Sequence, residues 1–72
     1  MPTTRNLRSP DEILRTALEK ETQARDFYAT LARQCSVGFV RELLENLQNE
    51  ESKHMQMIQG LLQRLGSGRP LI

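Results

Sequence analysis

The feature that most constrains the fold of this chain is an apolar stripe interrupted by residues of the types that commonly bind metals. In its second half, positions spaced alternately by four and three residues are apolar except at Glu51 and His54. The stripe consists of Val40, Leu44, Leu47, Glu51, His54, Ile58, Leu61 and Leu65. This spacing is typical of a helix packed against other helices. A carboxylate in such a stripe loses hydration, so we expect a proton, a cation or a hydrogen-bond partner to compensate it.

The first half of the chain has the same construction, with one carboxylate, Glu21, inside an apolar stripe. This stripe consists of Leu14, Ala17, Glu21, Ala24, Tyr28, Leu31 and Cys35. Two helices alone cannot surround a core, and a chain of 72 residues is near the size at which a metal or oligomerisation supports folding. We therefore predict an all-α fold, in which a two-helix antiparallel hairpin dimerises into a four-helix bundle.

Local signals mark the ends of both helices. Ser9, Pro10 and Glu12 supply an N-cap, a proline at the first helical position and a capping box. Gly66 is suited to end the second helix. The expected elements are a flexible arm at 1–8, a helical hairpin at 9–66 with helices at about 10–35 and 38–65, and a flexible tail at 67–72.

Composition limits the partners of the chain. Its net charge of +1 gives no argument for a nucleic-acid or membrane-surface partner, and its basic residues are scattered. The single cysteine, Cys35, excludes an internal disulfide and suits a reducing cytosol. No apolar run approaches the roughly 18 residues of a membrane span. We expect a soluble, cytoplasmic protein that binds neither nucleic acid nor membrane.

The polar residues that interrupt the two apolar stripes are expected to lie at the same height along the hairpin. Glu21 lies 15 residues before Ser36 and Glu51 lies 15 residues after it. At about 1.5 Å per residue, both lie some 22 Å from the turn on neighbouring antiparallel helices. Because His54 follows Glu51 by three residues, the two side chains share a helical face. The sequence thus predicts a cluster of two carboxylates and one imidazole.

One such cluster offers too few ligands to enclose a pair of metal ions. Two chains related by a twofold axis would supply four Glu and two His, the ligand set of a di-iron carboxylate bundle. Oxygen and nitrogen ligands suit iron or manganese, and the absence of thiolates argues against a structural zinc site. We therefore expect iron shared between two chains, in a homodimer or a higher even-numbered oligomer.

Two segments resemble the motifs of rubrerythrins, members of the ferritin-like di-iron superfamily. Residues 21–28, ETQARDFY, resemble the first-helix motif, in which an iron-binding Glu is followed seven residues later by Tyr. Residues 50–54, EESKH, resemble the second-helix motif. The resemblance implies that Glu21 and His54 are terminal iron ligands and that Glu51 bridges two irons. It also implies that Tyr28 lies beside the ligands.

The short length is similar to that of encapsulated ferritins, whose two-helix subunits form a ferroxidase site between chains and assemble into rings. That similarity implies Fe(II) oxidation for iron storage or detoxification, a ring-shaped oligomer, and a location inside an encapsulin shell. The chain has no paired Cys-x-x-Cys of a rubredoxin-like domain. Rubrerythrin-like peroxide reduction at the same site is the alternative activity.

Several structural interpretations stay open at this stage. Glu21 and Glu51 could pair with Arg25, or with an arginine of a partner chain, and set the register of the helices without metal. Tyr28 could simply fill the core. Glu50 could be a solvated residue or an auxiliary ligand. The whole chain could also be a non-enzymatic, dimeric helical-hairpin binding module.

Overall fold

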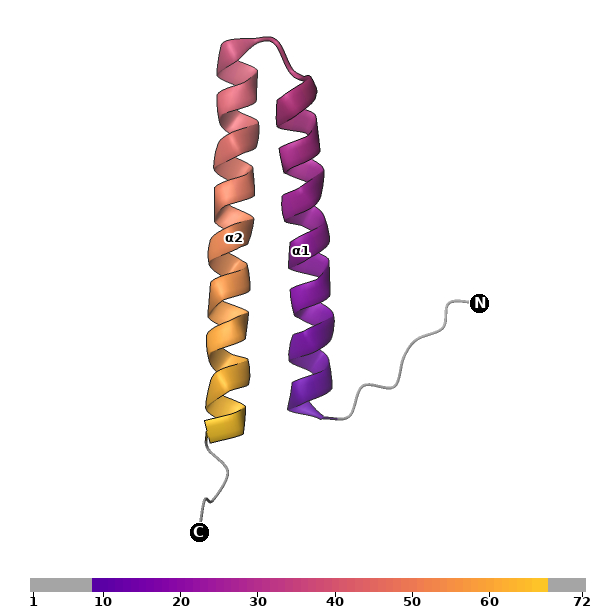
Figure 1. The fold of residues 1–72 in the computed structure, drawn as a ribbon, viewed down its shortest axis with the longest axis vertical. Coiled ribbons are helices and arrows are strands. Elements are labelled where there is room, and N and C mark those ends of the chain that lie inside the picture. The colour runs from indigo at the N-terminus through magenta and orange to yellow at the C-terminus, as the bar shows by residue number, and fades with distance from the viewer. Residues whose placement is uncertain (1–8, 68–72) are drawn as a thin grey trace, which may run out of the picture.

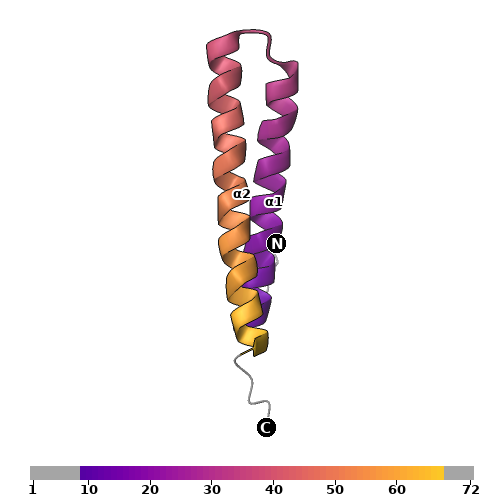
Figure 2. The same ribbon diagram turned by 60° about the vertical axis from the view of Figure 1, so that its left-hand side comes forward.

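The computed structural model describes residues 9–67, which form two antiparallel helices (Figure 1). Helix α1 spans Pro10–Gln34 and helix α2 spans Gly38–Ser67. A second view, turned by 60°, also shows the helices side by side, with the connection at one end and the free ends at the other (Figure 2). The all-α hairpin predicted from the sequence is confirmed. Its dimerisation into a four-helix bundle stays a prediction.

The start of α1 is fixed by a capping box at Ser9 and Glu12. The Glu12 backbone N–H donates to Ser9 Oγ over 3.0 Å, and the Ser9 backbone N–H donates to Glu12 Oε1 over 3.3 Å. These bonds satisfy donors that have no partner within the helix. Asp11 lies in the positively polarised first turn and pairs with Arg15 at 2.8 Å. The N-terminal boundary therefore follows from local chemistry.

A three-residue connection, 35–37, joins the helices. Cys35 leaves the helical conformation with φ −96° and ψ 125°, so α1 ends one residue before the expected position. The Val37 carbonyl accepts from the Val40 and Arg41 backbone N–H groups at 3.1 and 2.9 Å, which begins α2. A connection this short fixes both the register and the rotation of one helix against the other.

The C-terminal end of α2 differs from the expectation. We expected the helix to stop before Gly66, but α2 continues through Gly66 to Ser67. The reason is that no glycine of the described residues has a positive φ, so Gly66 adopts helical rather than left-handed geometry. The expected arm at 1–8 and residues 68–72 of the expected tail lie outside the described residues.

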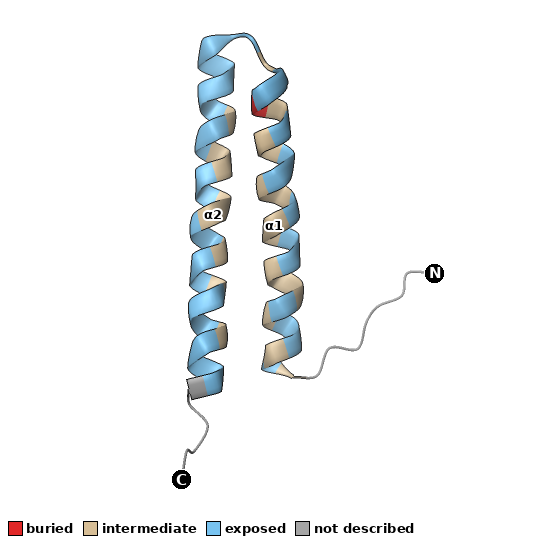
Figure 3. Ribbon diagram, viewed as in Figure 1, coloured by how far each residue is buried: buried red, intermediate tan, exposed pale blue. Residues whose placement is uncertain are grey.

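The two helices bury little of their surface against each other. Ala32, 5% exposed, is the one buried residue of the described chain, near the turn (Figure 3). Along both helices the half-buried residues line the inner sides, and the outer sides are exposed (Figure 3). Such an open pair of helices lacks an enclosed core. Among the described residues, no helix is long and apolar enough to cross a membrane.

The contact face of α2 is rotated relative to the expected stripe. Most half-buried residues of α2 fall in two rows of seven-residue spacing, one comprising Leu44, Glu51 and Ile58, the other Gln48, Met55 and Leu62. Leu47 and Ser52 are also half-buried. Four residues of the apolar stripe are exposed in the single hairpin: Val40, His54, Leu61 and Leu65. A single neighbouring helix covers only a narrow strip, so one edge of a broad apolar stripe stays open. We call this edge, formed by the exposed residues Val40, His54 and Leu61, the open edge of α2.

Candidate metal centre

The structure brings Glu21 of α1 together with Glu51 and His54 of α2. Donor atoms of the three side chains all lie within 4.8 Å of one another. Glu21 and Glu51 face each other because both lie the same number of residues from the turn. His54 lies one helical turn beyond Glu51, so its ring reaches back to the same point. We refer to these three residues as the Glu–Glu–His cluster.

His54 makes the hydrogen bonds that hold the cluster. Its Nδ1 lies 3.0 Å from Glu21 Oε1 and 3.3 Å from Glu51 Oε1. With the proton on Nδ1, the ring donates to both carboxylates. The Glu21 and Glu51 side chains are 30% and 19% exposed, and that of His54 is 48% exposed. The two carboxylates are therefore partly shielded from solvent between the helices, whereas the side of the cluster formed by the imidazole is open to solvent.

The proximity of the three groups lowers the pKa of Glu21 and raises the pKa values of Glu51 and His54. Hydrogen bonds from Glu51 and then from His54 hold the pKa of Glu21 below its usual value. The bond to Glu21, followed by desolvation, raises the pKa of Glu51. Hydrogen bonds to Glu21 and then Glu51 raise the pKa of His54. Without a metal, the cluster thus favours proton binding at Glu51 and His54 beside an ionised Glu21.

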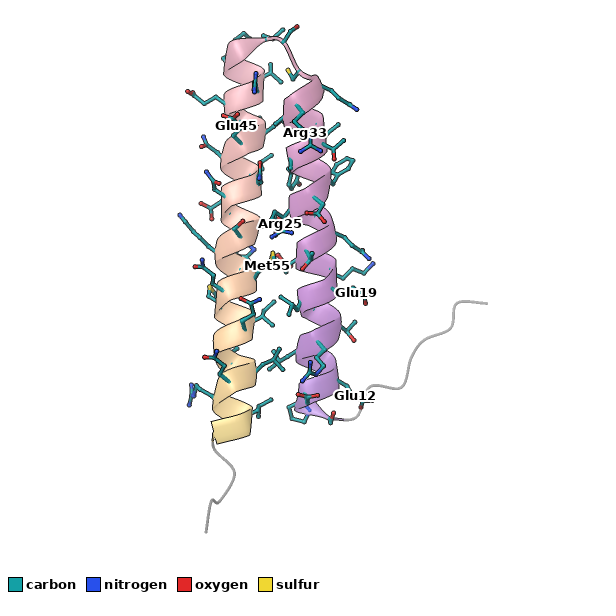
Figure 4. The ribbon with its side chains drawn as sticks, in the orientation of Figure 1. Glu12, Glu19, Arg25, Arg33, Glu45 and Met55 are labelled. Carbon is teal, nitrogen blue, oxygen red and sulfur yellow. The ribbon has the colours of Figure 1, made fainter. Side chains whose placement is uncertain are left out.

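The neighbouring basic side chain, Arg25, does not pair with the carboxylates of the cluster. Arg25, a candidate partner for the two half-buried carboxylates, instead donates to Asp26 Oδ1 at 3.0 and 3.1 Å. Figure 4 shows Arg25 and Met55 in the space between the helices, whereas Glu19 lies on the far side of α1. The ion pairs that the described residues show for Glu21 and Glu51 are both with His54. The interpretation in which Arg25 neutralises these carboxylates is not supported within the hairpin.

The two auxiliary candidates lie outside the cluster. Glu50 is exposed and pairs with Lys53 at 3.5 Å. Tyr28 is half-buried on α1, two turns after Glu21, and its ring packs at a tilt against Phe27 with centroids 5.7 Å apart. Among the described residues, the cluster contains no potential ligand that the sequence analysis had not singled out.

The cluster fits a transition metal by its chemistry. Two carboxylate oxygens and one imidazole nitrogen converge, and this mixture of donors suits iron or manganese better than calcium, which takes oxygen ligands alone. Nδ1 is the imidazole nitrogen that faces the carboxylates, so Nε2 is left to bond outward and orient the ring. Three protein donors leave coordination positions open to a second chain, to water or to an oxidant.

An antiparallel helical pair with Glu on one helix and Glu-x-x-His on the other, whose donor atoms converge, is the half-unit of a ferritin-like di-iron protein. The family comparison agrees with this class, because the family model described as Rubrerythrin matches residues 12–72. The chain belongs to the rubrerythrin family. No curated protein and no solved structure matches the chain. The resemblance to rubrerythrins is thereby confirmed, and the likeness to encapsulated ferritins stays a prediction.

Proposed function

We propose that two copies of this chain bind a pair of irons between them and oxidise Fe(II) to Fe(III). The observation that carries the proposal is the Glu–Glu–His cluster, whose donor atoms lie within 4.8 Å of one another in a chain of the rubrerythrin family. One hairpin supplies three donors, which cannot surround two ions. A twofold dimer supplies six, and its two hairpins complete the four-helix bundle.

Each ligand has a defined task in this proposal. Glu21, Glu51 and His54 of both copies would hold the irons, and the resemblance to rubrerythrins implies that Glu51 would be the carboxylate shared by the two ions. Four carboxylates per pair of irons favour the higher charge of Fe(III) over Fe(II), which drives electron loss. Two Fe(II) ions supply two electrons, and these reduce one oxygen molecule with two protons to hydrogen peroxide. The protein's residues bind the irons and leave positions open for the oxidant.

Iron binding at the cluster should also release protons. Iron binding competes with proton binding at Glu51 and His54, because the pKa of each is raised in the metal-free hairpin and only the deprotonated groups donate to a metal. Anaerobic loading should therefore release protons in proportion to the iron bound. Proton release together with binding separates the cluster from weak surface carboxylates, which are already ionised at neutral pH.

The test is anaerobic Fe(II) loading followed by admission of oxygen, with Fe(III) formation monitored by near-ultraviolet absorbance. Glu51→Gln should abolish rapid oxidation. Glu50→Gln is the matched control, because it removes a neighbouring carboxylate that pairs with Lys53 outside the cluster. Equal loss of oxidation in both variants, or in neither, would contradict the assignment. A stable dimer without iron binding would favour the non-enzymatic binding module.

Reduction of peroxide is the second candidate, favoured by the family to which the chain belongs. In that reaction the same two electrons reduce one hydrogen peroxide with two protons to two water molecules. The Fe(II)-loaded protein should then react faster with peroxide than with oxygen at equal concentration. Manganese as the metal, a ring-shaped oligomer, a cytoplasmic location and an encapsulin shell stay predictions of the sequence analysis.

A further inference from the structure

Met55 of α2 places a thioether beside the Glu–Glu–His cluster. It follows His54 directly and follows Glu51 by four residues, so its side chain neighbours that of Glu51 on the same helical face. Helical side chains lean toward the N-terminus of their helix, so the Met55 side chain extends back over the turn that carries Glu51. Met55 is half-buried and lies in the space between the helices (Figure 4). The thioether is therefore a near neighbour of the cluster within the hairpin.

The chemistry of the Met55 side chain favours oxidation rather than iron binding. A thioether is a soft donor that suits Cu(I), whereas the cluster combines carboxylates with an imidazole. The reaction that a thioether undergoes readily is the uptake of one oxygen atom to give a sulfoxide. The proposed function supplies an oxidant for this reaction, since two Fe(II) ions and oxygen yield one hydrogen peroxide. Met55 thus lies next to the source of a reagent that oxidises it.

We propose that Met55 intercepts hydrogen peroxide formed at the cluster and is oxidised to methionine sulfoxide. The inference rests on the proposed function, which forms the peroxide. The O–O bond of hydrogen peroxide breaks, one oxygen atom bonds to the Met55 sulfur, and the other leaves as water with both protons. The sulfur loses two electrons and the peroxide gains them. Each chain can remove one molecule of hydrogen peroxide in this way.

Met57 provides a comparison within the same helix. It lies two residues beyond Met55, a rotation of about 200° that puts it on nearly the opposite side of α2. Because Met57 is 66% exposed, it is more accessible than Met55 to peroxide from solution. Trypsin cleaves after Lys53 and Arg64, so residues 54–64 form one peptide that carries both thioethers. Fragment ions of that peptide give the ratio of Met55 sulfoxide to Met57 sulfoxide directly.

The test compares this ratio after two treatments of the full chain. In the first, hydrogen peroxide is added to metal-free protein, and accessibility alone should favour Met57. In the second, protein loaded anaerobically with Fe(II) is exposed to oxygen with catalase present, which destroys peroxide that escapes into solution. The ratio of Met55 to Met57 sulfoxide should then be at least about tenfold higher, because only the inner thioether meets peroxide before it escapes. An unchanged ratio, or a Met55 that stays unoxidised when catalase is present, would overturn the inference.

Leucine substitutions supply matched variants, because leucine nearly conserves the volume of methionine and lacks the sulfur. Without catalase, Met55→Leu should release more hydrogen peroxide per iron oxidised than the wild type, up to one molecule for two irons. Met57→Leu should match the wild type. Fe(III) formation is recorded in the same reactions. Rapid iron oxidation with equal peroxide release from all three proteins would refute this inference and leave the proposed function standing, whereas absence of iron oxidation would refute both.

Discussion

At the scale of the residue, His54 connects the two carboxylates of the cluster. Its Nδ1 lies within 3.3 Å of an oxygen of each, and its exposed side lies on the open edge of α2. With its proton on Nδ1, the ring joins the two carboxylates by hydrogen bonds, and with iron it would act as a ligand through the same nitrogen. Protons and metal therefore compete for one position.

The stability of the metal-free protein should depend on pH through His54. Its pKa is raised from 6.5, so the folded state binds the proton more tightly than the unfolded state. This contribution is complete below 6.5 and is lost as pH rises through the raised value. The raised pKa of Glu51 acts in the same direction, and Glu21, whose pKa is lowered, is already ionised in this range.

We therefore expect the Tm of the metal-free wild type, measured relative to that of His54→Ala, to fall as pH rises from about 6 to about 8. Circular dichroism melts of both proteins over this range are the measurement. Iron affinity should change in the opposite direction and increase with pH. A Tm difference that stays constant across the range would show that the three groups do not interact in solution.

His54→Ala should also eliminate rapid Fe(II) oxidation, because it removes one ligand from each iron of a symmetric pair. The helices should persist, since the imidazole is half exposed and contributes little apolar burial. Stopped-flow absorbance gives the oxidation rate, and circular dichroism gives the helix content. Retention of the wild-type rate would remove His54 from the ligand set.

At the scale of the element, the N-terminus of α1 depends on one side chain. Ser9→Ala removes the acceptor of the Glu12 backbone N–H and should cost about 1 kcal/mol of unfolding free energy. Chemical denaturation at fixed protein concentration measures this loss. Ser9→Asp, which keeps an N-capping acceptor, should restore most of it. Equal stability of the Ser9→Ala variant and the wild type would show that the capping box does not contribute.

The interior glycine of α2 offers a gain of stability. A Cβ added at Gly60 would meet nothing within 4 Å in the hairpin. Gly60→Ala should therefore stabilise the protein by up to about 1 kcal/mol, because alanine loses less backbone entropy in a helix. Denaturant titration is again the measurement. A clear destabilisation would indicate that a second chain approaches the backbone closely at this position.

Some of these elements follow directly from the sequence. Ser9, Pro10 and Glu12 satisfy local backbone donors, so the start of α1 was predictable. The equal distance of Glu21 and Glu51 from Ser36 also placed the cluster, because antiparallel helices keep register from a tight turn. The sequence did not show which edge of α2 faces α1. Apolar residues lie on both sides of Glu51 around the helix. The rotation of α2 that the turn imposes leaves Met55 half-buried against α1 and Leu61 exposed.

At the scale of the whole molecule, the hairpin is incomplete in two respects. Its apolar surface is open, with Leu61 and Leu65 exposed, and its cluster has only three donors. A second copy would remedy both, so we expect a dimer or a higher even-numbered oligomer. Light scattering at micromolar concentration measures the mass. A stable, helical monomer that does not associate when iron is added would contradict the shared site.

The carboxylates should make the metal-free bundle less stable. Replacing Glu21, Glu51 and His54 with leucine completes the apolar stripe and relieves the desolvation of four carboxylates per dimer. The triple-leucine variant should therefore melt at a higher temperature than the metal-free wild type, while oxidation is lost. Functional sites often carry such a stability cost. A lower Tm of the variant would instead identify the three residues as a structural pairing.

The most direct test of a shared di-iron site is Mössbauer spectroscopy of the protein loaded with one 57Fe per chain and then oxidised. We expect a quadrupole doublet without magnetic splitting at low temperature in a weak applied field, because two Fe(III) ions bridged by Glu51 couple to a diamagnetic ground state. The same spectrum of Glu51→Gln should lose the doublet. A magnetically split spectrum of isolated high-spin Fe(III) in the wild type would show that the irons are not close enough to couple, and would contradict a pair shared between two chains.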